Sequence, residues 1–225
     1  MSLKLVLVLF VSIIPGVLWM QYFYKKDRYE PEPKYLVILA FLGGIVSIFP
    51  AMLFEQVFLI RFFSGEVRGL FNLIAAAASI GIIEEGLKLL ALYWIALRHR
   101  DFNEPVDGII YGVSVGLGFA VIENIFYTSR FGLSVGVLRA VVGCLAHAAF
   151  SGLAGHYWAE AKFKRQPGKY YAAFFWPAAW HGLYDFLLFN ESITRLFAAL
   201  AVIGVVIAFI LSKIRNLVTA SPFKE

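Results

Sequence analysis

Charged and imidazole side chains interrupt the most apolar stretches of this sequence. A charged side chain at the centre of a lipid bilayer costs about 2.5–3.5 kcal/mol on insertion scales. The presence of each of these residues therefore needs a physical explanation. They gather in four stretches, at residues 70–97, 107–129, 133–160 and 170–190. In this order the stretches contain Glu84, Glu85 and Lys88; Glu123 and Asn124; His147; and His181 and Asp185.

The spacing within each stretch places functional side chains in pairs. Residues four apart share one face of an α-helix. A carboxylate one turn from an imidazole can fix its tautomer, and a lysine one turn from a glutamate can keep it ionised in a dry setting. Simple helix packing in lipid needs only Gly, Ala and Ser, so the pairs favour acid–base chemistry. The pairs are Glu84 with Lys88, Phe119 with Glu123, His147 with Ser151, and His181 with Asp185.

The depth of these residues predicts one shared site. At about 1.5 Å of rise per helical residue, all of them lie roughly 17–24 Å from the cytoplasmic ends predicted for their stretches. The hydrocarbon core of a bilayer is about 30 Å thick, so the groups occupy one layer, at the midplane or slightly outside it. We therefore expect four neighbouring helices to bring them together in one cavity.

The elements that must position this layer are membrane-spanning helices. The chain has 225 residues, is 60% hydrophobic and has a mean hydropathy of +0.76, which is typical of a polytopic membrane protein. We predict a single all-α transmembrane helix bundle over residues 1–225, with the catalytic core at roughly 70–190. One cysteine excludes an internal disulfide, and nucleic acid is not an expected partner. The seven predicted spans are 3–24, 35–60, 70–97, 107–129, 133–160, 170–190 and 193–214.

The orientation of the bundle follows from its basic loops. Lysine and arginine concentrate after the first, third and fifth spans and in the C-terminal tail. The positive-inside rule then puts the N-terminus outside and the C-terminus in the cytoplasm. Near the outer face, Glu55 is expected close to the end of its span, and Arg139 is expected to extend its side chain to the outer surface.

Four motifs in this order resemble the PrsW family of bacterial intramembrane proteases. They are Glu84-Glu85-x-x-Lys88, Phe119-x-x-x-Glu123-Asn124, His147-x-x-x-Ser151 and His181-x-x-x-Asp185. The wider superfamily contains CAAX-processing and bacteriocin-processing proteases and the Aph-1 subunit of γ-secretase. The resemblance implies a multi-pass protein of the bacterial plasma membrane that makes the first cut in a single-pass anti-sigma factor under envelope stress, leading to release of a sigma factor. Lys88 and Glu123-Asn124 depart from the CAAX-protease pattern, which argues against prenyl-protein processing.

Peptide hydrolysis needs an activated water, a stabilised oxyanion and a proton for the leaving amine. A glutamate general base fits these residues best, with Glu85 preferred slightly to Glu84. His147 is expected to hold the water. His181, oriented by Asp185, and Asn124 are expected to donate to the oxyanion.

Other chemistries use the same residues. Two histidines and a glutamate suffice for a catalytic zinc ion, here Glu85, His147 and His181. The H-E-x-x-H pairing on one helix is absent, so the sequence favours a metal-free mechanism without a cofactor, with zinc as the alternative. A proton-coupled transporter stays open because buried acids and histidines mark proton pathways, although no internal repeat is found. A non-catalytic scaffold stays open through the relationship to Aph-1.

Overall fold

The described part of the chain is built from helices and contains no strand. The computed structural model describes residues 3–63, 69–189 and 192–224, and confirms the all-α prediction. A short π-helical segment, η1 (Tyr93–Leu97), continues α3 without a break. The seven α-helices are α1 (Leu3–Tyr24), α2 (Lys34–Phe63), α3 (Leu70–Leu92), α4 (Pro105–Phe131), α5 (Leu133–Phe163), α6 (Gly168–Leu188) and α7 (Ile193–Thr219).

Each predicted span coincides with one helix, because continuous apolar runs separated by Pro-, Gly- and charge-rich loops leave little freedom in placing the ends. The prediction for the sixth span extended to residue 190, which lies outside the described residues, and α6 itself ends at Leu188. Five described helices, α1, α2, α4, α5 and α7, are long and apolar enough to cross a membrane. The protein is therefore a multi-pass membrane protein. Two statements stay predictions: that α3 and α6 also cross the membrane, and the direction in which the helices cross it.

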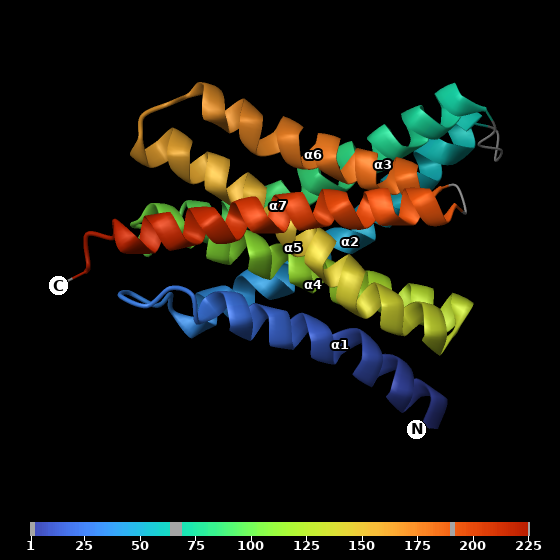
Figure 1. Ribbon diagram of the computed structural model, residues 1–225, viewed down its shortest axis with the longest axis horizontal. Helices are drawn as coiled ribbons and strands as arrows, with labels where there is room; N and C mark the ends of the chain where they lie inside the picture. The colour runs from blue at the N-terminus through green and yellow to red at the C-terminus, as the bar shows by residue number, and fades with distance from the viewer. Residues whose placement is uncertain (1–2, 64–68, 190–191, 225) are drawn as a thin grey trace.

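Helices α4 and α5 form the centre of the bundle (Figure 1). Helix α4 contacts α1, α2, α3, α5 and α7, and most of its residues are buried. It approaches α5 closely because glycines recur every four residues on one face. A methyl group added to Gly108, Gly112 or Gly116 would collide with the backbone carbonyl groups of Gly155, Ser151 and His147, respectively. The last of these contacts fixes the backbone of a predicted site residue.

Helices α3 and α6 lie side by side on one flank of the bundle (Figure 1). Gly81 makes this approach close, since a side chain there would collide with the carbonyl oxygen of Ala178 and the backbone of Gly182. The contact lies within one turn of Glu84 on α3 and beside His181 on α6. Small residues thus hold the acidic helix against the helix that carries the second histidine.

The close packing of α4 on α5 can be tested with one methyl group. We expect Gly112→Ala to lower the free energy of unfolding by about 1–3 kcal/mol, because the central helices must separate. Gly204→Ala in α7 is the matched control, since a side chain there meets open space and alanine favours a helix by up to about 1 kcal/mol. Thermal unfolding in detergent measures both. Equal stability of the two variants would contradict the packing.

Candidate active site

Lys88 lies at the centre of a buried polar cluster. Its Nζ is 2.6 Å from Glu85 Oε1 and 3.0 Å from Glu84 Oε2, both one turn earlier on α3. It also lies 2.8 Å from Nδ1 of His147 on α5, and 4.3 Å from the centre of the Phe119 ring on α4. Buried charges are stable only when paired and hydrogen-bonded, and this one ammonium group contacts two carboxylates, an imidazole and an aromatic face.

His181 is held by Glu85. Its Nδ1 donates to Glu85 Oε1 over 2.8 Å, whereas its Nε2 lies 3.5 Å from Asp185 Oδ2. Asp185, which was expected to orient this ring, thus lies at Nε2, and the close contact of α3 with α6 places Glu85 at Nδ1 as a second and closer partner. Nε2 then faces Glu84, at 3.7 Å from Oε2.

His147 is held in the same manner from the opposite side. Its Nε2 donates to Glu123 Oε2 over 2.8 Å, and Nη2 of Arg139 lies 2.5 Å from the same oxygen. Arg139 was expected to extend outward, but it is 19% exposed and stacks on Tyr127. A carboxylate within reach competes with solvent for the guanidinium group, since a bidentate donor pairs well in a partly buried setting.

Two further predicted residues differ in their relation to the cluster. The hydroxyl group of Ser151 lies 3.4 Å from Glu85 Oε2, so it supports that carboxylate. Asn124 is fully buried between α4 and α5, where its amide donates to Cys144 Sγ at 3.4 Å. It does not line the cavity of the cluster, and the expected donation to an oxyanion has no support in this position.

A cavity of about 450 Å³ opens beside the cluster. Glu84 lines this cavity and Glu85 does not, although the sequence slightly preferred Glu85 as the base. Glu85 is 1% exposed and hydrogen-bonded to three neighbours, whereas Glu84 Oε2 is buried without a hydrogen bond. The predicted residues on the wall are Phe119, Glu84, Glu123, His147, His181 and Asp185.

Several residues on the cavity wall were not predicted as site residues. Glu55 of α2 lines it with an unpartnered buried oxygen, although the sequence placed it near a span end. Arg139 and Tyr127 also line it. The sequence contained a feature that could have identified each as a site residue. Glu55 is a carboxylate inside an apolar run, and Arg139 lies eight residues before His147. Neither has a polar partner four residues away, which was the pattern used to recognise the others.

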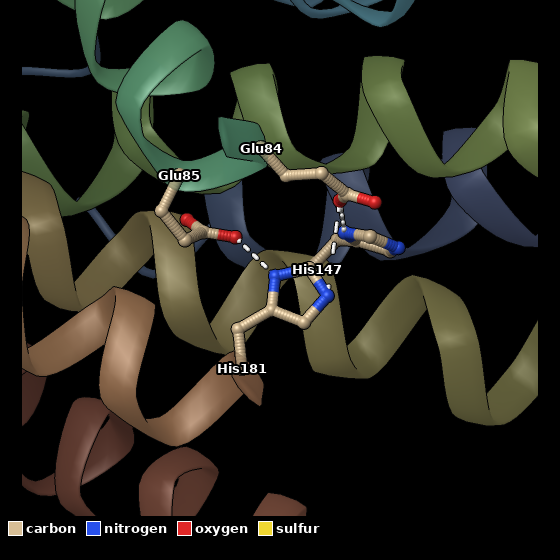
Figure 2. A group of neighbouring side chains, drawn as sticks. All are labelled: Glu84, Glu85, His147 and His181. Atoms are coloured by element: carbon tan, nitrogen blue, oxygen red, sulfur yellow. Dashed lines mark hydrogen bonds and ion pairs between the residues drawn. The ribbon is translucent and has the colours of Figure 1, made fainter. Parts of the chain in front are cut away.

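The cluster can hold a metal ion. Glu84, Glu85, His147 and His181 each offer a ligand atom, and these atoms lie within 4.8 Å of one another (Figure 2). Metal-binding histidines usually donate their second nitrogen to a carboxylate, as both do here, to Glu85 and Glu123. The inner nitrogens then lie 3.8 Å and 3.7 Å from Glu84 Oε2. Two imidazoles and a carboxylate suit catalytic zinc, so the residues fit.

Together, the multi-pass bundle and its buried carboxylate–imidazole site define a membrane-embedded enzyme equipped for hydrolysis. A family model described as "PrsW family intramembrane metalloprotease" matches residues 32–212. The chain therefore belongs to the PrsW family of intramembrane proteases, as the motifs indicated.

Curated relatives agree with this assignment. "Protease PrsW" of Geobacillus kaustophilus is 39% identical over 181 residues, covering 79% of this chain and 77% of that protein. The protein of the same name from Bacillus subtilis is 34% identical, covering 79% and 80%, and that of Clostridioides difficile is 34% identical, covering 85% and 82%. No solved structure matches the chain. Because the family is described as metalloproteases and the site fits an ion, the preference for a metal-free mechanism has no support over a metal-dependent one.

The central role of Glu85 predicts a stability difference between the two adjacent glutamates. Glu85→Gln leaves Lys88 without its shortest ion pair, and breaking a buried pair costs about 3–5 kcal/mol. Glu84→Gln removes only the longer of the two ion pairs, at 3.0 Å, and leaves the contacts of Glu85 with His181 and Ser151 in place, so we expect a smaller loss. Thermal unfolding of both variants in detergent checks this order, and greater damage from Glu84→Gln would contradict it.

Proposed function

We propose that this protein makes the first cut in a membrane-anchored anti-sigma factor, with Glu84 as the residue that activates water. The observation that carries the proposal is the position of Glu84 Oε2. It is buried, lines the cavity, pairs with Lys88 Nζ at 3.0 Å and lies between the inner nitrogens of two histidines. A carboxylate oxygen in this position can accept a proton from a water molecule that the two rings flank.

The histidines complete the chemistry from the same wall. His147 accepts a hydrogen bond from Lys88 at Nδ1, so its ring is fixed beside the water. His181, when protonated on both nitrogens, donates through Nε2 to the oxyanion that forms on the scissile carbonyl. The proton that Glu84 takes from the water goes later to the leaving amine, and Asp185, 3.5 Å from His181 Nε2, pairs with the charged form of that ring.

Other side chains position these groups without touching the reacting atoms. Glu85 and Glu123 each bind the outer nitrogen of one histidine. Arg139 anchors Glu123, and Lys88 anchors Glu85. Such support matters because catalytic groups must be held to within about 0.5 Å of their working geometry.

A metal ion, where present, would be held by Glu84, His147 and His181. It would supply a bound water of lowered pKa and an electrophile for the carbonyl group. The set expected from the sequence contained Glu85 in place of Glu84. In the structure Glu85 accepts a hydrogen bond from Nδ1 of His181, so Glu84 replaces it in the set. Lys88 contacts the same donor atoms, so its ammonium group must move or lose its proton when an ion binds.

The substrate proposal rests on the family and on the surroundings of the site. An intramembrane protease acts on membrane proteins, and the PrsW resemblance implies a single-pass anti-sigma factor. The apolar part of the cavity wall, including Ile48, Met52 and Leu59 of α2, suits an unwound segment of a transmembrane helix. With the N-terminus outside, the site lies toward the outer face, where cleavage frees an extracytoplasmic segment.

Cleavage in liposomes with a membrane-anchored anti-sigma substrate tests the role of Glu84. We expect Glu84→Gln to lower the turnover number by about 10²–10⁴-fold, which is the usual contribution of general base catalysis. Its unfolding temperature should stay near that of the wild type. Asp101→Asn, which changes a carboxylate paired with Arg100 in a loop, is the control and should cleave normally. Full cleavage by a folded Glu84→Gln variant would exclude Glu84 as the base.

Chelation separates the two mechanisms. If Glu84, His147 and His181 hold a zinc ion, a zinc chelator abolishes cleavage and added Zn²⁺ restores it, because the inner nitrogens and Glu84 Oε2 form a zinc-type set. Cleavage that persists in chelator yet is lost in Glu84→Gln would assign metal-free acid–base catalysis. A wild-type protein that binds substrate without cutting it would instead support a scaffold.

A further inference from the structure

A second group of buried carboxylates lies far from the active site. Asp27 and Glu32 belong to the loop between α1 and α2, and Asp107 to the first turn of α4. The three residues are 3%, 3% and 0% exposed. Figure 1 places this loop at the end of the bundle where α4 begins. Asp107 and Glu123 are 16 residues apart on α4, so about 24 Å separates the group from the catalytic layer.

Each of these carboxylates keeps one oxygen without a hydrogen bond. The unpartnered buried atoms are Asp27 Oδ2, Glu32 Oε1 and Asp107 Oδ1. One carboxylate oxygen from each residue lies within 4.8 Å of those of the other two. Three buried acids that point oxygen atoms at one another would not be stable as bare anions, because a buried charge needs a compensating partner.

The protein itself supplies hydrogen bonds but no ion pair. Tyr111 donates its hydroxyl proton to the other oxygen of Glu32, and the backbone N–H groups of Asn103 and Glu104 donate to Asp107 Oδ2 over 2.8 Å each. Among the described residues, none of the observed ion pairs involves Asp27, Glu32 or Asp107. These donors orient Glu32 and Asp107 and leave one oxygen of each without a hydrogen bond.

We propose that Asp27, Glu32 and Asp107 bind a hard divalent cation of the Ca²⁺ type. Carboxylate oxygens are the ligands that Ca²⁺ prefers, at about 2.3–2.6 Å. Two oxygens on opposite sides of such an ion are about 4.6–5.2 Å apart, which accommodates the observed group. Mg²⁺ demands near-ideal octahedral geometry at about 2.0–2.1 Å and is usually bound through one or two carboxylates rather than by an all-protein cage. Zinc is disfavoured because no histidine or cysteine belongs to the group.

A fourth carboxylate extends the site. Glu104 precedes α4, is 1% exposed and has its own unpartnered buried oxygen, Oε1. Ca²⁺ takes six to eight ligands, so a neighbouring carboxylate and water molecules can complete the shell. Bound in this way, the cation connects the α1–α2 loop to the start of α4, the helix that carries Glu123.

Protons compete with the cation for the carboxylate oxygens of this site. Burial and the neighbouring carboxylates raise the pKa of Asp27 to about 7 and that of Glu32 to about 10. Without a cation, the group would then be neutralised by shared protons. A cation that binds there must displace them, so the two occupants give different results when calcium is added at fixed pH.

Terbium luminescence tests the proposal in the full-length protein, stripped with chelator and held in a non-ionic detergent. Tb³⁺ reports sites of the Ca²⁺ type, and Tyr111 lies close enough to sensitise it. We expect saturable emission that Ca²⁺ displaces at lower concentration than Mg²⁺. Glu32→Gln should weaken Tb³⁺ binding by at least about ten-fold. The control Asp101→Asn and an active-site double variant, Glu84→Gln with His147→Ala, should bind as the wild type does.

The unfolding temperature provides an independent measurement if Glu32→Gln folds poorly. We expect Ca²⁺ to raise that of the wild type and of the active-site double variant, and to leave that of Asp27→Asn unchanged. Absence of calcium-displaceable emission in the wild type, or its full retention in both Glu32→Gln and Asp27→Asn, would overturn the site. A calcium-independent gain in stability from Asp27→Asn would assign the group to protons.

Discussion

The site depends on the contact between Glu85 and Lys88. Two charges buried this deeply repay the cost of leaving water only when their remaining hydrogen-bonding capacity is also satisfied. Glu85 meets that condition by accepting from His181 on α6 as well as from Lys88, with Ser151 of α5 close by. One carboxylate of α3 therefore ties three helices together, and Glu84 beside it, paired with Lys88, faces the cavity.

Small residues make this arrangement accessible to the backbone. Gly81 lets α6 approach α3, and Gly116 lets α4 approach the backbone of His147. Without these approaches the side chains could not span the distances between helix axes, which are usually 8–10 Å. The polar network fixes the helices in one register, while the glycines set the distance between the helix axes. Both are needed because lipid gives helices no hydrophobic reason to associate.

The sequence predicts the helices and the membership of the cluster well, but not its internal contacts. Continuous apolar runs and four-residue spacing suffice to bring Glu84, His147 and His181 together. The choice of Glu85 as the partner of His181, and of Arg139 for Glu123, depends on how each helix is rotated and how closely it packs. Those quantities come from all the side chains at once. Glu55 shows the same limit, since only the packing of α2 brings it to the cavity.

The helices that carry Glu84, Glu85 and His181 are not among the five that are apolar enough to cross a membrane on their composition. The closest partners of their charged groups lie on one another and on α5. During synthesis, α3 emerges from the ribosome before α5 and α6 exist to receive it. On the prediction that α3 crosses the membrane, it becomes stable in lipid only when the later helices are present, so a partly made chain holds no assembled protease that could attack neighbouring proteins.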